Sequence, residues 1–412
     1  MLLLLPVAFA RPSATVALTF DDLPYQTRDR RPALEDPAER AAVTEAILAA
    51  LGRTPAAVFV NCGWLADGED LAERWGRAGH AVANHTAHHP SVDRAEDWAT
   101  EVAACDLRLR GVPGFEPWFR YPYLRHGQTA EVRAAAGAAL AASGLRNVPP
   151  TVPTSEWWLG AAYDRADAPT REALASAYVD HVVESIRLAQ DHARARVGHD
   201  VPHVVLLHVN RLEADHLGAL LSRFEAEDIA VVPVERALRD EVYARPDVYD
   251  GGGSVSWLFR LDPTGPPDPE PFGALEGALA QRFRPAHGLR WTWAVPIERQ
   301  TAFSDEVARR VHALGIDLEL EAVDGRLVAE VFSLPSEEEL VRAALLGGST
   351  LEWSVALDLP EALRVDDPAR GLRVVPGAVS RRGGAEAVTS AAAVQGPADA
   401  IAALAESAPE GG

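Results

Sequence analysis

A regular alternation of short apolar runs and helical segments is the feature that most constrains the fold of this chain. Short runs typical of buried strands occupy residues 14–18, 56–60, 80–84, 118–121, 203–208 and 229–232; the run at 118–121 is aromatic, and the others are rich in Val, Ala and Leu. Segments with a helical period lie between and after them, at residues 36–51, 71–78, 95–110, 131–143, 170–196 and 214–226. This order predicts an α/β fold, a parallel sheet with helices outside, either open or closed into a barrel.

A proline cluster ends this pattern. Five prolines between residues 262 and 273 predict a stiff, extended linker. Beyond it we expect strands at 289–298, 316–323, 327–332 and 351–357, with helices at 304–314 and 336–346. The central pair of strands would form a hairpin across Asp324-Gly325, a favoured two-residue turn. The resulting β-α-β-β-α-β order is that of a ferredoxin-like α+β module, to which we assign no catalysis.

These observations divide the 412 residues into five parts. They are a signal-peptide remnant (1–12), an α/β domain (13–260), a Pro-rich linker (261–284), an α+β accessory domain (285–360) and a partly disordered C-terminal extension (361–412). The apolar run that ends in Ala8-Phe9-Ala10 fits a signal-peptide cleavage pattern. We therefore expect a secreted, periplasmic or cell-envelope protein; a cytoplasmic location is the alternative if this run is not a signal.

The net charge limits the possible binding partners, and the cysteine content limits the possible disulfides. The formal net charge of −21 argues against nucleic acid or an anionic membrane as the main partner. No run of about 18 apolar residues predicts a transmembrane segment. Cys62 and Cys105 are too few for a disulfide framework. They could form one bridge after export, but we favour two buried thiols.

Two adjacent carboxylates, Asp21 and Asp22, follow the first predicted strand in the segment Leu18-Thr-Phe-Asp-Asp-Leu23. Neighbouring carboxylates at a strand's mouth repel each other and lose hydration, so they need a partner. A divalent metal ion on one would settle the conflict and leave the other free as a base. The alternative is that Asp-Asp only opens a loop.

Three histidines follow the third predicted strand, in Asn84-His-Thr-Ala-His-His-Pro90. His85 and His89 are four residues apart and could point to one side of a helical turn. Two imidazoles and one carboxylate leave a coordination position open for water, as in catalytic zinc sites. A bound metal would lower the pKa of that water to about 7. The alternative is a His-rich surface loop, to which we assign His88.

With Arg120-Tyr-Pro-Tyr123 and Leu206-Leu-His208 in the same order along the chain, these segments resemble the polysaccharide deacetylases of carbohydrate esterase family 4. The resemblance covers roughly residues 14–259. It implies a distorted (β/α) barrel with the active groups at the C-terminal mouths of the strands, in agreement with the general rule for barrels.

The resemblance also implies roles for individual residues. Asp21 would be the general base. Asp22, His85 and His89 would hold a divalent metal, zinc before cobalt or another ion.

Three further roles come with the same resemblance. Arg120 would pair with Asp21, although an ordinary strand-end salt bridge is the alternative. The backbone N–H of Tyr123 would help to hold the oxyanion. His208 would be the acid that protonates the leaving amine, the alternative being a core histidine.

One motif departs from the family. Many members have an Asp-x-x-Asp-Trp segment, whereas this chain has Pro153 and Glu156 at the two Asp positions. We expect Glu156 to tune Arg120 or His208 with one extra methylene of reach. Trp157 and Trp158 could form the floor of a sugar subsite, and packing within the wall is an equal alternative.

The sequence therefore favours a hydrolase that acts on C–N bonds other than peptide bonds. It would remove N-acetyl groups from amino sugars of a polysaccharide, peptidoglycan or chitin-like, and release acetate. O-acetylated xylan is a further open substrate. Two alternatives remain: a metal-dependent amidohydrolase of a small amide or imide, and a non-catalytic glycan-binding protein of the same fold.

Overall fold

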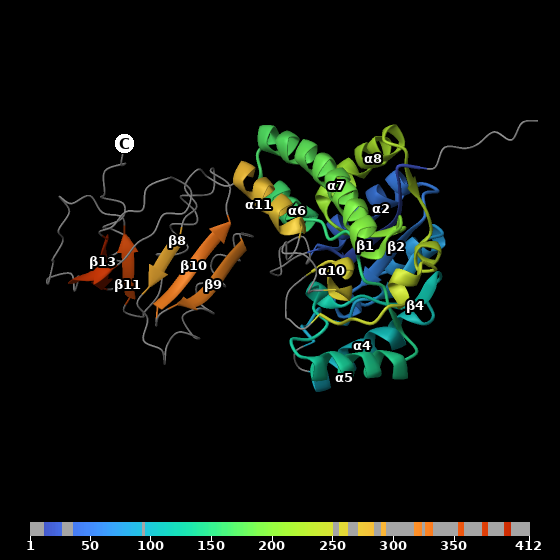
Figure 1. Cartoon of the computed structure of the whole chain (residues 1–412), viewed down its shortest axis with the longest axis horizontal. Helices are drawn as coiled ribbons and strands as arrows, with labels where there is room; N and C mark the ends of the chain where they lie inside the picture. Colours follow the sequence, from blue (N-terminus) through green and yellow to red (C-terminus); the bar gives the residue numbers. More distant parts are fainter. Residues whose placement is uncertain are drawn as a thin grey trace, which may run out of the picture. The chain divides into compact units, whose positions relative to one another are not determined.

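The computed structural model describes residues 12–26, 36–92, 95–249, 255–262 and 271–283, and six strands beyond residue 289 (Figure 1). The chain divides into two compact units, Met1–Gly277 and Ala278–Gly412. Among the helices of these described ranges, none is long and apolar enough to cross a membrane. The first unit carries the predicted α/β pattern.

Seven parallel strands form the sheet of the first unit, and their order is β5-β4-β3-β2-β1-β6, with β7 paired to β1. The strands are β1 Ala14–Leu23, β2 Ala56–Val60, β3 Ala81–Asn84, β4 Phe115–Phe119, β5 Arg146–Asn147, β6 His203–His208 and β7 Ile229–Val231. Strand β1 is central, because it pairs with β2, β6 and β7. The sheet therefore brings the ends of distant segments to the end of β1.

Helices connect these strands, as the alternation predicts. They are α2 Pro37–Leu51, α3 Leu71–Arg77, α4 Ala95–Leu109, α5 Ala130–Ala142, α6 Glu156–Arg165, α7 Ala168–Val197 and α8 Arg211–Ala226. Side-chain caps begin several of them: the Asp36 carboxylate accepts from Ala38 N–H, and the Asp167 carboxylate from Thr170 N–H. This arrangement of parallel strands and outer helices, a (β/α) half-barrel, confirms the predicted fold class.

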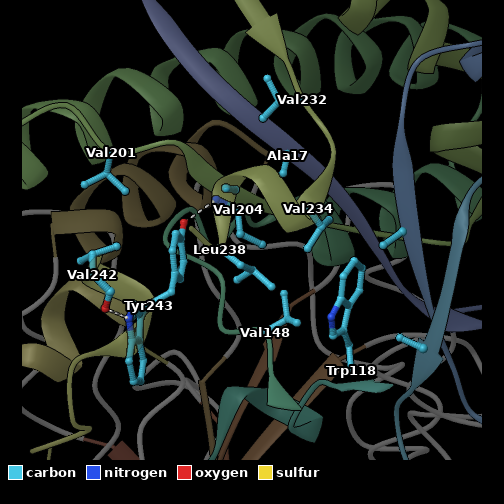
Figure 2. Close-up of a cluster of buried hydrophobic side chains, with 14 of the residues drawn as sticks. Ala17, Trp118, Val148, Val201, Val204, Val232, Val234, Leu238, Val242 and Tyr243 are labelled. Atoms are coloured by element: carbon cyan, nitrogen blue, oxygen red, sulfur yellow. Dashed lines mark hydrogen bonds between the residues drawn. The ribbon is translucent and has the colours of Figure 1, made fainter. Parts of the chain in front are cut away.

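The segment after β7 covers part of the sheet. It contains α9 Val234–Ala237, the 3₁₀ turn η3 Glu241–Ala244 and α10 Trp257–Leu261. Figure 2 shows its side chains packed with residues of the strands, including Ala17 of β1 and Trp118 of β4. Tyr243 accepts from Val204 N–H at 3.0 Å and donates to the Pro202 carbonyl at 2.8 Å. This segment thus closes the core, and the buried Tyr243 hydroxyl is satisfied by the two backbone groups.

Several boundaries differ from those predicted. Strand β4 begins and ends earlier, so Arg120 and Tyr121 follow the strand instead of belonging to it. The short β5 and helix α6 were not predicted at all. The expectation of an extended linker over 261–284 is wrong for α11, Pro271–Phe283. Proline is compatible with the first turn of a helix, and Ala and Leu follow Pro271 in this segment.

The second unit contains a six-stranded sheet in the order β12-β13-β11-β8-β10-β9, antiparallel at each pairing. Its strands are β8 Arg290–Trp293, β9 Asp317–Val323, β10 Arg326–Phe332, β11 Trp353–Leu357, β12 Arg373–Gly377 and β13 Ala391–Gly396. Four of them are predicted strands. The predicted helices 304–314 and 336–346, the turn Asp324-Gly325 and the N-terminal residues 1–11 lie outside the described residues. Strands β12 and β13 belong to the range that we expected to be partly disordered.

The first prediction concerns the contact between α3 and the loop before β4. A Cβ atom on Gly76 would lie 1.7 Å from the carbonyl oxygen of Pro113, so no side chain fits there. We expect Gly76→Ala to lower the free energy of unfolding by about 1–3 kcal/mol, measured by chemical denaturation.

Gly137→Ala is the matched control. Gly137 is an exposed position inside α5, with no other atom within 4 Å of the added Cβ. Alanine there should raise stability by about 0.5–1 kcal/mol. Equal stability of the two variants would contradict the close contact.

Candidate active site and metal centre

The C-terminal ends of the parallel strands gather the predicted chemical groups at one edge of the sheet. Asp21 of β1 is in register with His208 of β6. Asn84 ends β3, and its carbonyl accepts from Arg120 N–H at 3.1 Å, just after β4. The ends of β1, β3, β4 and β6 therefore meet, which is the position of active sites in barrels of this class.

Backbone strain concentrates at the same place. Among the described residues, six that are not glycine have positive φ, and five belong to these strand ends: Asp22, Thr86, His89, Tyr123 and Leu124. Left-handed conformations cost non-glycine residues of the order of 1–3 kcal/mol each. Such conformations persist only where the surrounding contacts enforce them. Here those contacts also aim the side chains of Asp22 and His89 at each other.

Asp22, His85 and His89 form a group of potential metal ligands, whose ligand atoms all lie within 4.8 Å of one another. The Asp22 Oδ1 atom is 3.4 Å from Nε2 of His85 and 3.4 Å from Nε2 of His89. This oxygen is buried and has no hydrogen-bond partner in the described part of the chain. A buried carboxylate oxygen without a partner is costly, so the group needs a positive charge at this point.

The tautomer of His85 supports the same conclusion. Its Nδ1 lies 2.8 Å from the carbonyl oxygen of Arg120, which can only accept a hydrogen bond. Nδ1 therefore carries the proton, and the Nε2 lone pair faces the Asp22 carboxylate. Two lone pairs at this separation repel unless a cation lies between them. The donor set, two imidazoles and a carboxylate, fits a divalent metal ion of the zinc type.

A loop, not a helical turn, brings the two histidines together. The segment from His85 to Pro90 contains no helix, so the predicted helical turn is wrong. The Asn84 side chain instead accepts from Thr86 N–H at 2.8 Å, and Thr86 Oγ1 accepts from His89 N–H at 3.0 Å. The rings of His85 and His89 then lie 4.8 Å apart. His88 lies outside the group, with Nδ1 3.0 Å from Glu101.

Burial and neighbouring charges set the protonation of this group. Burial alone would raise the pKa of Asp22, but the imidazoles of His89 and His85 lower it overall. Burial also lowers the pKa of His89 to about 3, against the opposing effect of Asp22. At neutral pH the group therefore offers an ionised carboxylate and a neutral imidazole, the forms that bind metals.

Asp21 lies beside this group and is paired with Arg120. The guanidinium Nη1 of Arg120 lies 3.2 Å from both oxygens of Asp21, and both side chains are buried. Arg120 also donates to the Val148 carbonyl and to Thr19 Oγ1, and it stacks over Phe59. These contacts fix the Asp21 carboxylate with one face toward His85 Nε2, at 3.7 Å.

His208 is held by Glu156. Its Nδ1 lies 2.8 Å from Glu156 Oε2, which leaves Nε2 for the pocket. Burial lowers the pKa of His208, but the hydrogen bond and charge of Glu156 more than offset this and raise it. Of the two partners that we expected for Glu156, the structure shows His208 and not Arg120. Glu156 itself is fully buried, at 0% exposure.

A pocket opens over these groups. Asp21, Asp22, His85, His89 and His208 all line it, and Tyr123 and Trp157 lie in its wall. Trp158 is not among its lining residues. Tyr123 is 45% exposed, and its ring lies 4.4 Å from that of His89.

Further lining residues were not found from the sequence: Gln26, His181, Phe272 and Glu276. Phe272 and Glu276 belong to α11, in the segment predicted to be a linker. His181 lies in the middle of α7, where its Nε2 accepts from Ser155 N–H at 3.0 Å. The sequence offered one indication that His181 lines a site: it is a polar residue on the buried face of a long helix.

Comparison with known proteins agrees with this geometry. Residues 10–141 match the family model described as polysaccharide deacetylase. The chain carries a polysaccharide deacetylase domain. No curated protein matches the chain.

Solved structures similar to this chain include a family 4 carbohydrate esterase from Streptomyces lividans, with 19% identity over 55% of this chain and 96% of that one (TM-score 0.37). A peptidoglycan deacetylase from Bacillus subtilis has 21% identity over 56% and 93% (TM-score 0.38). A family 4 pseudoenzyme from Bacillus anthracis has 17% identity over 56% and 67% (TM-score 0.38).

The second prediction concerns His181 and pH. Burial lowers the pKa of His181 to about 4 in the folded state, whereas an unfolded histidine titrates near 6.5. Between these values the unfolded chain binds the proton and the folded chain does not, so stability falls as the pH falls. His181 should contribute up to about 3 kcal/mol to this loss between pH 6.5 and 4.

His181→Gln keeps an acceptor near Ser155 N–H but cannot titrate. We expect its free energy of unfolding to fall less steeply than that of the unmodified protein over this range. Parallel stability curves for the two proteins would show that His181 binds its proton equally well in both states.

Proposed function

We propose that the domain is a metal-dependent deacetylase that removes N-acetyl groups from amino sugars of a polysaccharide. The observation that carries this proposal is the unsatisfied Asp22 oxygen between the two Nε2 atoms of His85 and His89. A second carboxylate, Asp21, and a histidine with a raised pKa, His208, line the same pocket. This combination supplies a metal site, a base and an acid.

Asp22, His85 and His89 would hold the ion, with zinc first among the divalent metals on the basis of the donor set. When bound, the metal would activate a water molecule and polarise the acetyl carbonyl. Asp21 takes the proton of the attacking water, and Arg120 keeps its carboxylate oriented for this step. His208, held through Nδ1 by Glu156, gives the proton of Nε2 to the leaving amine. The backbone N–H of Tyr123 donates to the developing oxyanion.

The pocket wall and the family resemblance support this substrate class. Trp157 and Tyr123 present aromatic surface beside the acid and the metal ligands, and pyranose rings pack against such surfaces. Peptidoglycan and chitin-like polymers both carry N-acetylated amino sugars. We place the enzyme in the cell envelope or outside the cell, where these polymers are found.

The decisive experiment measures acetate release. The purified full chain is incubated with N-acetylated oligosaccharides of chitin and peptidoglycan type, and with small N-acetyl amides, with and without a chelator. Acetate from the oligosaccharides that stops with chelator and returns with zinc supports the proposal. Hydrolysis of the small amides alone would favour an amidohydrolase. Oligosaccharide binding without turnover would favour a non-catalytic glycan-binding protein.

The third prediction concerns metal content. Asp22→Ala, His85→Ala and His89→Ala should each lose bound metal, because each removes one of three ligands. Elemental analysis of the purified variants measures this directly. His88→Ala is the matched control, since His88 is a neighbouring histidine that contacts Glu101 instead. Full metal in His89→Ala would refute the assignment.

The fourth prediction concerns the base. Asp21→Asn preserves the shape of the side chain but cannot take the proton, so it should retain metal and lose about 10²–10⁴ in kcat. His208→Ala should lose a similar factor and change the alkaline limb of the pH–rate profile. Initial rates and metal content are measured on the same samples. An Asp21→Asn enzyme with a near-native rate would show that the base lies elsewhere.

A further inference from the structure

A chain of hydrogen bonds lies behind His208, outside the pocket. Glu156 contributes no atom to the pocket lining, so its two carboxylate oxygens are satisfied within the protein. His208 binds Oε2, and the side-chain amide of Asn210 donates to Oε1. Asn210 is itself 1% exposed. We infer that Asn210 is a positioning residue: by holding Glu156, it fixes the orientation of the His208 imidazole.

Backbone groups determine the direction of the hydrogen bonds that Asn210 and Gln26 make. Glu213 N–H, in the first turn of α8, donates to Asn210 Oδ1 at 3.0 Å. This bond determines which atom of the Asn210 amide is the oxygen. The amide nitrogen of Asn210 must then face Glu156 and Gln26, whose Oε1 accepts at 3.2 Å. At the other end, the Trp157 carbonyl accepts from Gln26 Nε2 at 3.3 Å. Since a backbone N–H can only donate and a carbonyl can only accept, neither amide can be flipped.

A second buried carboxyl group, that of Glu213, belongs to the same region. Glu213 is buried next to Glu156, and Tyr178 donates to its Oε2 at 2.7 Å. Burial, and then the charge of Glu156, raise the pKa of Glu213 well above its usual range. The raised pKa favours the neutral form of Glu213.

A glycine in α6, Gly160, allows the Asn210 side chain to lie close to this helix. Gly160 lies one turn after Glu156 in α6, and a Cβ atom there would be 2.5 Å from Asn210 Nδ2. Any side chain at this position would push the amide away from Glu156. Gly218, inside α8, has open space within 4 Å of an added Cβ and offers a matched comparison.

The first arm of the test reverses one hydrogen bond. Asn210→Asp keeps the acceptor for Glu213 N–H, because Asp caps helices as well as Asn. It replaces the donor toward Glu156 with an acceptor. We expect kcat to fall at least tenfold with little change in KM.

A second substitution should restore the pairing. In the double variant Glu156→Gln/Asn210→Asp, the introduced Gln amide donates to the introduced Asp carboxylate, while the Gln oxygen accepts from His208 Nδ1. The kcat of this variant should exceed the value expected from multiplying the two single effects. Purely multiplicative effects would overturn the inference.

The second arm needs no new charge. Gly160→Ala should lower kcat about tenfold, although Ala is the better helix former. Gly218→Ala should leave kcat unchanged. Equal kcat values for the two variants would contradict the inference that the placement of the Asn210 side chain affects catalysis.

This inference rests on the proposed role of His208 as acid, so a readout independent of turnover is included. Nitrogen NMR of histidine-labelled protein reports the proton position on each ring, and His208→Asn identifies the His208 signals. We expect Nδ1–H in the unmodified protein and altered His208 signals in Asn210→Asp and Gly160→Ala. If no acetate is released, the proposed function fails, but the NMR measurement still tests whether Asn210 orients the His208 imidazole. Unchanged His208 signals in both variants would overturn the inference.

Discussion

The burial of two adjacent carboxylates at the end of β1 is the constraint on which the site depends. Removing one charged group from water costs several kcal/mol even after the protein relaxes, and a second charge beside it adds repulsion. The protein meets this demand in two different ways. Asp21 receives a buried guanidinium, Arg120, at 3.2 Å. Asp22 Oδ1 instead lies 3.4 Å from Nε2 of both His85 and His89, which leaves room for a cation. The unequal treatment of two identical side chains is what separates a base from a ligand.

The rigidity of this arrangement comes from strained backbone held by side chains. Asp22, His89 and Tyr123 all adopt positive φ, a conformation that none of them prefers. The loop that carries His85 and His89 is fixed by neighbours that take no part in the chemistry. Asn61 holds the His85 carbonyl, and Asn84 and Thr86 fold the histidine loop. Strain of this kind is expected at sites where a precise arrangement matters more than local stability.

The sequence predicted the sheet and the residue types of the site, because both depend on local signals. Apolar runs of strand length mark β1, β2 and β6, and polar residues directly after them must share one edge of a parallel sheet. The missing parts depend on contacts between distant segments. Helix α6 has a weak apolar pattern, and α11 follows a proline cluster that indicates a linker. The loop that joins His85 and His89 was interpreted as a helical turn, since their spacing of four fits one. Its actual shape is set by the side chains of Asn84 and Thr86, which spacing does not reveal.

The substitution of Glu for Asp at position 156 illustrates how the fold can absorb a change in a motif. Glu156 is the first residue of α6, where the positive end of the helix dipole stabilises a carboxylate. The extra methylene places the carboxylate farther from its backbone, so both oxygens need anchors to keep one orientation. His208 supplies one anchor, and Asn210, fixed in turn by the start of α8, supplies the other. Glycine at position 160 then leaves space for Asn210. A longer acid at this position is therefore compatible with an oriented histidine, provided that these three neighbours remain.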